Sequence, residues 1–319
     1  MLGRRARELS GRAVKALSPN PKAQISESNR MIAIEKLRYV RLGVADPQAS
    51  ADFATRILGL QPVASEEPTA MFRCDDRDHT LVLYPSASPE QTLAIELRSE
   101  AALQAAASRL REAGYAVASG DAALCRARRV KALVSFRIRG AVTIELVVRP
   151  LDSGWRYFPS RDAGITEFFG VAFASTDVDA DVRLWTAMFD GKVTDYVGDA
   201  VYIGIDEEHH RIAVHPSASD RLLEVQFRLE SMHEVMQNSY FLQSAQVAIA
   251  HGPGRRPTSQ QVFLSFKGPD PVMFGFVAEG DKPARDDDRL PRQFPRAPGS
   301  FCAWGSLSLV PEFCGSPVP

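Results

Sequence analysis

The chain has little cysteine, no long apolar segment and almost no net charge, and each of these absences argues against a class of protein. Its four cysteines are scattered without the short spacings of metal-binding motifs, which favours reduced thiols in the cytoplasm over a disulfide framework. No apolar run approaches the roughly 18 residues that a membrane-spanning helix needs. The net charge of −1 gives no electrostatic reason to expect nucleic acid or a membrane as partner. We therefore expect a cytoplasmic globular protein.

What the sequence does contain is an internal repeat. The segment 75–88 (DDRDHTLVLYPSAS) recurs 131 residues later at 206–219 (DEEHHRIAVHPSAS), with six of fourteen positions identical. The same offset places the dipeptide 45–46 on the dipeptide 176–177, each ahead of an amphipathic segment. A repeat this long exceeds the roughly 20–50 residues of solenoid units, so it indicates two modules of domain size.

Composition divides the rest of the chain around these modules. Residues 1–30 are rich in Arg, Ala and Ser, which is typical of a disordered arm or of a targeting peptide. A third interpretation is that translation starts at Met31. The modules are expected at 31–150 and 165–280. Residues 281–319 are rich in Pro, Arg and Ser, and we expect them to wrap a module surface or to extend freely.

Each module reads as a strand, a helix and then several strands, which is an α+β pattern. In the first module a strand is predicted at 37–44, and a helix at 49–58 follows the entry signal Asp46-Pro47 and ends at Gly59. By the same periodicities, the other elements predicted there are strands at 71–74, 80–84, 93–97, 132–138 and 142–148 and a helix at 100–113. In the second module they are strands at 170–174, 200–205, 211–214, 224–228, 261–265 and 273–278, helices at 182–189 and 232–243, and a loop at 251–259.

Two sequence segments resemble those of a known protein family. RLGVADPQASADFATRILGL at 41–60 and GPGRRPTS at 252–259, with the repeated βαβββ plan, are similar to the vicinal oxygen chelate superfamily and, within it, to two-domain type I extradiol catechol dioxygenases. The resemblance covers about residues 34–280. It implies an α+β fold of tandem duplicated modules, each made of paired βαβββ units that form a curled mixed sheet. In that family the second module holds Fe(II) through two His and one Glu, and the metal chelates the catechol oxygens and O2.

The resemblance places the three metal ligands of the family at Gly170, Glu224 and Gly275. A glycine has no ligand atom, and one carboxylate alone does not hold Fe(II) against water. We therefore predict no metal ligand and no cofactor, with Fe(II) as the alternative.

Other positions of the resemblance carry polar residues. Arg256 stands where relatives have a His, and Ser265 stands where they have a substrate-facing Tyr. His210 matches a His that acts as acid or base beside the bound catechol. His79 is the counterpart of His210 in the first module, which favours a structural or inherited role as the alternative for His210.

These residues define the predicted site in the second module. Arg256 is predicted to pair with Glu224 and to bind an oxyanion or enolate, and His210 is predicted to shuttle a proton near neutral pH. The alternatives are a solvated Arg256 in a Gly/Pro loop and a Glu224 paired for structural reasons. The predicted substrate-binding residues, whose aromatic members are equally typical of a core, are Trp185, Tyr202, Phe227, Phe263, Ser265 and Lys267.

A substitute metal site at His209, His210 and His215 is not expected. Strand alternation would put His209 and His215 on one face about 20 Å apart, at about 3.3 Å per residue. The same alternation would point His210 to the other face.

Three functions remain open from the sequence, and whether the protein is an enzyme stays undecided with the balance towards one. The first is an enzyme that acts on an aromatic or phenolic molecule without catalytic iron, by acid–base or oxygenase chemistry. The second is a non-catalytic descendant that binds an aromatic ligand or another protein. The third is iron-dependent extradiol ring cleavage. The expected partner is a small aromatic molecule, and a homo-oligomer is possible.

Overall fold

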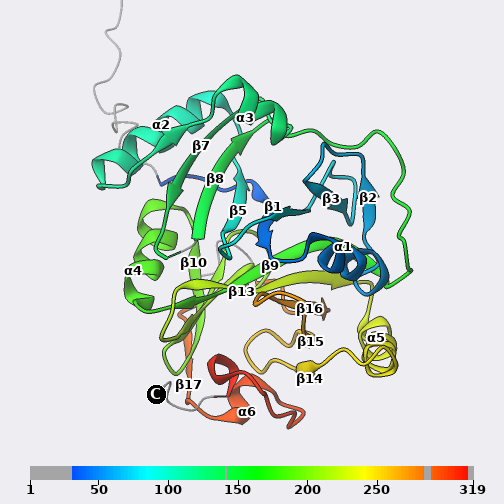
Figure 1. Ribbon diagram of the computed structural model, residues 1–319. Helices are drawn as coiled ribbons and strands as arrows, with labels where there is room; N and C mark the ends of the chain where they lie inside the picture. The colour runs from blue at the N-terminus through cyan, green and yellow to red at the C-terminus, as the bar shows by residue number, and fades with distance from the viewer. Residues whose placement is uncertain (1–30, 141, 284–288, 315–319) are drawn as a thin grey trace, which may run out of the picture. The chain divides into compact units, whose positions relative to one another are not determined.

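A computed structural model of the protein describes residues 31–140, 142–283 and 289–314 (Figure 1). The predicted arm at 1–30 lies outside these residues. No helix in the described ranges is long and apolar enough to cross a bilayer. Two mixed β-sheets with few helices make up the described chain, which confirms the predicted α+β class of two curled mixed sheets.

The first sheet has the strand order β2-β3-β4-β1-β5-β8-β7-β6. Its central strand β1 pairs in parallel with β4 and antiparallel with β5. Its strands are β1 (Lys36–Val44), β2 (Gln61–Val63), β3 (Ala70–Arg73), β4 (Leu81–Pro85), β5 (Gln91–Glu96), β6 (Ala118–Ser119), β7 (Ala132–Arg137) and β8 (Val142–Val148). Its helices are α1 (Pro47–Arg56), α2 (Glu100–Glu112) and α3 (Ala122–Ala127).

The second sheet has the order β14-β15-β16-β13-β9-β12-β11-β10-β17. Its strands are β9 (Ile165–Ser175), β10 (Lys192–Val197), β11 (Ala200–Gly204), β12 (Ile212–Pro216), β13 (Arg221–Leu229), β14 (Ile249–Arg255), β15 (Val262–Lys267), β16 (Met273–Ala278) and β17 (Arg292–Phe294). Its helical segments are α4 (Val178–Arg183), the π-helical turn η3 (Leu184–Met188), α5 (Met232–Ser244), α6 (Pro298–Phe301) and the 3-10 turn η4 (Pro311–Phe313). From β10 to β14 its order matches that of the first sheet strand for strand, and β17 is an addition.

The repeated dipeptides at 45–46 and 176–177 have one structural role. The carboxylate of Asp46 accepts a hydrogen bond from the backbone N–H of Ala49 at 3.0 Å, which caps α1. The carboxylate of Asp177 caps α4 in the same way through Ala180, also at 3.0 Å. Side-chain capping satisfies an otherwise unpaired N–H of the first turn, so the same short signal begins the first helix after the central strand of each sheet.

Several predicted boundaries are wrong. The helix expected at 182–189 begins at Val178 and turns π-helical from Leu184. The loop expected at 251–259 begins inside β14, an edge strand whose sequence IAHGPGR contains two glycines and a proline; such residues are tolerated in a strand mainly at an edge. The strands β2, β6, β10, β14 and β17 and the helices α3 and α6 were not predicted.

The second sheet packs on its two faces against different partners. Phe173 of β9 and Phe227 of β13 belong to the large apolar core that includes residues of α2 and α5. Neighbouring residues of the same strands, such as Ala172 and Leu223, belong to a separate cluster with residues of the C-terminal segment. That segment runs along the sheet through β17 and α6 (Figure 1), so the face opposite the helices is covered by the tail. We call this face of the second sheet the inner face.

Candidate functional site

Three histidine rings surround one tyrosine on the inner face. Tyr202 of β11 lies with its ring centroid 6.4 Å from His209, 4.9 Å from His210 and 6.1 Å from His215. All four side chains are buried. The prediction that His210 lies apart from the other two is wrong, because β12 begins only at Ile212 and strand alternation does not apply to the preceding turn.

A line of hydrogen bonds leads from this tyrosine cluster to a buried carboxylate. His209 Nδ1 lies 3.1 Å from His210 Nδ1, and His209 Nε2 lies 2.8 Å from Asp195 Oδ2. Arg292 of β17 binds the same carboxylate through Nε at 3.0 Å and its terminal nitrogen at 2.6 Å. Burial raises the pKa of Asp195, but hydrogen bonds from His209 and Arg292 prevail and hold this pKa at about 2. Asp195 is therefore an anion throughout the neutral range.

Three of the inner-face histidines, His210, His215 and His251, are held neutral. Burial, with the neighbouring His209 and the Arg256 cation, lowers the pKa of His210 well below its usual value. Burial and Arg256 also lower the pKa of His215 to about 3 and that of His251 to about 4. A neutral imidazole accepts a hydrogen bond at one nitrogen and donates one at the other, so these rings can pair with a polar ligand in either sense.

The predicted ion pair between Arg256 and Glu224 is not formed. Within the described ranges, Glu224 Oε1 and Arg256 Nε are both buried without a hydrogen-bond partner. Glu224 is fully buried and accepts a hydrogen bond from Gln226 Nε2 at 2.6 Å. The Arg256 guanidinium instead lies 4.4 Å from the centre of the Phe263 ring, and it opposes the rise in pKa that burial causes at Tyr202. Arg256 is buried rather than solvated, at 4% exposure.

The expected ligand positions lie in neighbouring strands but carry no ligand set. Gln226 of β13 is the register partner of both Gly170 in β9 and Gly275 in β16. A Cβ at Gly170 would lie 2.4 Å from the carbonyl oxygen of Arg211, and one at Gly275 would lie 2.7 Å from Glu224 Oε1. Backbone and carboxylate atoms therefore fill the space where ligand side chains would begin. Across the described residues, no three His, Cys, Asp or Glu side chains group as a candidate metal site.

The predicted lining residues divide between the two faces. Tyr202 belongs to the inner-face cluster, and Ser265 is buried with His251 and Gly275 as its register partners. Lys267 stands at the rim of a hollow described below. Trp185 and Phe227 are not part of the site, because they pack in the core on the helix side.

Sequence reasoning missed several members of the site. Asp195, His251 and Gln226 were not singled out, nor were the tail residues Phe301 and Phe313 that lie against the ring of His215. One available signal was the small number of histidines. The chain has six histidines, and four of them, at positions 209, 210, 215 and 251, lie in the second module around the inner face.

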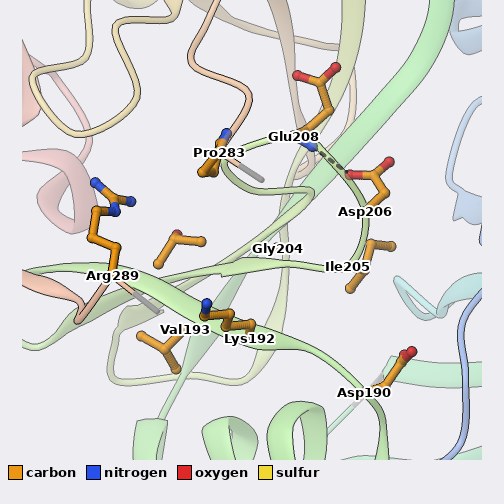
Figure 2. A pocket seen from close by; sticks show the side chains of 10 residues that line it. Asp190, Lys192, Val193, Gly204, Ile205, Asp206, Glu208, Pro283 and Arg289 are labelled. Carbon is orange, nitrogen blue, oxygen red and sulfur yellow. Dashed lines mark hydrogen bonds between the residues drawn. The ribbon is translucent and has the colours of Figure 1, made fainter. Parts of the chain in front are cut away.

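A hollow of about 300 Å³ opens beside this cluster. It lies between the strand ends at Leu223, Lys267 and Met273 and the tail at 309–312. Leu223 and Met273 belong to the same apolar cluster as Tyr202, so the hollow borders the cluster that contains this tyrosine. A second pocket, shown in Figure 2, measures about 40 Å³ and is lined by residues such as Gly204 and Glu208. A volume of about 40 Å³ has room for only a few water molecules, at roughly 10–15 Å³ each, and no predicted site residue lines it.

Comparisons with known proteins agree on one family. The sequence model of the Glyoxalase/Bleomycin resistance protein/Dioxygenase superfamily matches residues 36–128 and 169–276. Over 122 residues the chain is 30% identical to the biphenyl-2,3-diol 1,2-dioxygenase of Pseudomonas sp. (strain KKS102), covering 38% of this chain and only 42% of that protein. Over 278 residues it is 27% identical to the 3-methylcatechol 2,3-dioxygenase of Pseudomonas putida, covering 81% and 93%. The Mn(II)-bound glyoxalase from Novosphingobium aromaticivorans has the same fold, with a TM-score of 0.79 at 22% identity over 90% of this chain and 95% of that one.

These names correct the prediction that no cofactor is involved. One further relative, from Rhodococcus jostii (strain RHA1) and 28% identical over 116 residues (36% of this chain and 39% of that protein), is named an iron-dependent extradiol dioxygenase. The glyoxalase named above was solved with Mn(II). Metal dependence is thus a property of the relatives, and the prediction is wrong. Gly170, Glu224 and Gly275 still do not fit a three-ligand site by themselves, because two of them have no donor atom.

Proposed function

Because the chain belongs to the Glyoxalase/Bleomycin resistance protein/Dioxygenase superfamily, we propose that its second module binds a small phenolic molecule. The proposed site is the inner-face cluster of Tyr202, His210, Glu224 and Arg256. The relatives named for biphenyl-2,3-diol and 3-methylcatechol support this class of ligand.

The observation that carries the proposal is a set of buried polar atoms without hydrogen-bond partners in the described ranges. They are His210 Nε2, His215 Nδ1, Glu224 Oε1 and Arg256 Nε. Each buried polar atom left unpaired costs about 1–3 kcal/mol, so several of them around one tyrosine indicate a guest that pairs with them. A phenol fits, since its hydroxyl donates to an imidazole nitrogen or a carboxylate and accepts from a guanidinium.

The hollow at Lys267 supports a small ligand and a route to the cluster. Its volume of about 300 Å³ lies at the lower end of the roughly 300–1,000 Å³ of ligand pockets, which suits one ring with substituents. The exposed ammonium of Lys267 attracts a phenolate at the rim. Leu223 and Met273 then offer apolar contacts on the way to Tyr202.

The chemistry that these residues support is proton transfer at a phenolic hydroxyl. His210, held neutral, takes the hydroxyl proton, and the Arg256 guanidinium stabilises the phenolate that results. Tyr202 orients the ring from the side. The role of Glu224 is to accept the hydrogen bond of a second hydroxyl, which selects catechols over simple phenols.

Calorimetric titration with 3-methylcatechol and with biphenyl-2,3-diol tests the proposal, with and without added Fe(II) or Mn(II). We expect saturable binding, and we expect Glu224→Gln and Arg256→Gln each to lower the affinity about tenfold or more, because a hydrogen bond to a charged group is lost. Glu230→Gln, an exposed carboxylate outside the site, should leave affinity unchanged. If neither catechol binds, or if both site variants bind as the parent does, the proposal is wrong.

Oxygen uptake in the same samples separates an enzyme from a carrier. Uptake that needs an added metal assigns metal-dependent ring oxidation. Binding without uptake under every condition assigns a non-catalytic binding protein.

A further inference from the structure

A buried carboxylate and two imidazoles form a continuous line on the inner face. Asp195 of β10 is hydrogen-bonded to His209, with 2.8 Å between Oδ2 and Nε2. His209 is in turn hydrogen-bonded to His210, with 3.1 Å between the two Nδ1 atoms. All three side chains are at most 2% exposed. We propose that Asp195 and His209 are positioning residues that fix the tautomer of His210 and take over the charge of the proton it accepts. The charge-transfer part rests on the proposed function, and the tautomer part does not.

The tautomer follows from the hydrogen-bonding capacity of each group. A carboxylate only accepts hydrogen bonds, so His209 presents Nε2–H to Asp195. In the neutral form of His209 the lone pair is then on Nδ1, which faces Nδ1 of His210. His210 must therefore carry its proton on Nδ1 and leave Nε2 as an acceptor. His210 Nε2 is buried and has no hydrogen-bond partner within the described chain. It is therefore available to accept a hydrogen bond or a proton from a bound ligand.

Accepting a proton does not leave the charge on His210. When a phenol hydroxyl gives its proton to His210 Nε2, the Nδ1 proton of His210 passes to His209 Nδ1. One N–H bond forms on each ring and one breaks on His210. The products are a phenolate, a neutral His210 with Nε2–H, and a His209 imidazolium beside the Asp195 carboxylate.

The surroundings of the two rings favour this placement of charge. Arg256, Arg211 and His215 lie near His210 and oppose a positive charge there, as does burial. His209 instead faces an anion at 2.8 Å, so its cation forms a hydrogen-bonded ion pair. An imidazolium is therefore better stabilised at His209 than at His210.

Other elements hold the carboxylate in register with His209. Arg292 of β17 binds Asp195 through its side chain and through its backbone N–H, which donates at 2.9 Å. The Thr194 hydroxyl donates to the Tyr202 carbonyl at 3.1 Å and lies 3.4 Å from His209 Nδ1. The proton of this hydroxyl is used elsewhere, which leaves His209 Nδ1 to accept from His210. The tail thus contributes a residue to the line through β17.

Nitrogen-15 NMR of histidine-labelled protein tests the tautomer without any ligand. The chain has six histidines, which single substitutions assign. At neutral pH we expect the Nδ1–H form of His210 to exceed the Nε2–H form about tenfold or more, since a hydrogen bond in a charged line shifts such an equilibrium by an order of magnitude. A His210 found mainly as Nε2–H in the parent protein overturns the proposal.

Two variants test the line itself. His209→Phe keeps a ring against Tyr202 but removes the acceptor, and Asp195→Asn removes the carboxylate; both should abolish the excess of the Nδ1–H form. His233→Gln, an exposed histidine, should leave it unchanged. An unaltered His210 tautomer in folded His209→Phe or Asp195→Asn contradicts the inference.

Adding 3-methylcatechol tests the charge transfer separately. We expect the His209 signals to become those of an imidazolium, and those of His210 to become those of the neutral Nε2–H form. A doubly protonated His210 overturns this second part. If the tautomer is as expected but no catechol binds, the proposed function fails and the positioning role of Asp195 and His209 stands.

Discussion

Lowering the pH from 7 to 5 is expected to destabilise the protein through His215, because this ring is held neutral inside the second module. Its centroid lies 4.9 Å from the Phe313 ring and 6.3 Å from the Phe301 ring, and the side chain is 1% exposed. Burial and the Arg256 cation lower its pKa to about 3. In the unfolded chain the same imidazole has a pKa of about 6.5.

The direction and size of the effect follow from these two values. As the pH falls below about 6.5, the unfolded chain binds a proton at His215 and the folded protein does not. The stabilisation is therefore complete above the unfolded pKa and is lost as the pH falls towards about 3. Between pH 7 and 5 the loss is about 2 kcal/mol, at about 1.4 kcal/mol per pH unit below 6.5. His251, with a pKa of about 4, adds a loss of about the same size over this range.

Urea unfolding at pH 7 and pH 5 measures this loss as the change in free energy of unfolding. We expect His215→Phe, which keeps an aromatic ring but cannot titrate, to lose about 2 kcal/mol less than the parent between the two pH values. His233→Gln, at an exposed position, should lose as much as the parent. The reasoning is refuted if His215→Phe shows the full pH dependence of the parent with an unchanged dependence on urea.

Three further predictions concern stability at pH 7 and are measured by the same unfolding experiment. Gly170→Ala should cost about 1–3 kcal/mol through overpacking, because its Cβ would lie 2.4 Å from the Arg211 carbonyl oxygen, whereas Gly154→Ala meets nothing within 4 Å; equal effects of the two would contradict the close approach. Phe313→Ala should cost about 3–5 kcal/mol as a buried ring is lost, and a cost below about 1 kcal/mol would show that the tail does not pack on the inner face. Glu224→Gln should change stability by no more than about 1 kcal/mol or raise it, since it removes a buried charge whose Oε1 has no partner in the described chain; a loss above about 3 kcal/mol would reveal a partner cation.

The fold was predictable because its signals are local and repeated. The capping carboxylates Asp46 and Asp177 each act within one helical turn, and the 131-residue offset repeats the plan. The strands that escaped prediction are the short ones and those at or near sheet edges, such as β6 and β14. Their hydrogen bonds are made with another strand and not within the segment itself, so their own sequences carry little of the signal.

The site was less predictable because it depends on where turns begin. His210 and Tyr202 were found, but strand alternation was extended into the turn before β12, and this separated rings that are in contact. The expected pairing of Arg256 with Glu224 failed for a related reason. The sequence placed both residues in the predicted site of the second module, but the distance between two long side chains depends on the neighbours that they contact, here Phe263 and Gln226.

The C-terminal tail contributes residues to the inner face, so the surroundings of its polar residues could not be predicted from the repeated modules alone. The family match in the second module ends at residue 276, whereas Phe301, Phe313 and Arg292 lie beyond it and complete the surroundings of His215 and Asp195. Burial by the two phenylalanines removes water from His215, and Arg292 fixes the carboxylate that orients His209. Burial and the Arg256 cation together lower the pKa of His215, and Arg256 lies within the family match. The electrostatic state of the inner face therefore depends both on the second module and on the tail, which has no counterpart in the repeat. Comparison of matching positions in the two modules identifies the polar residues, but it does not include the tail residues that bury or bind them.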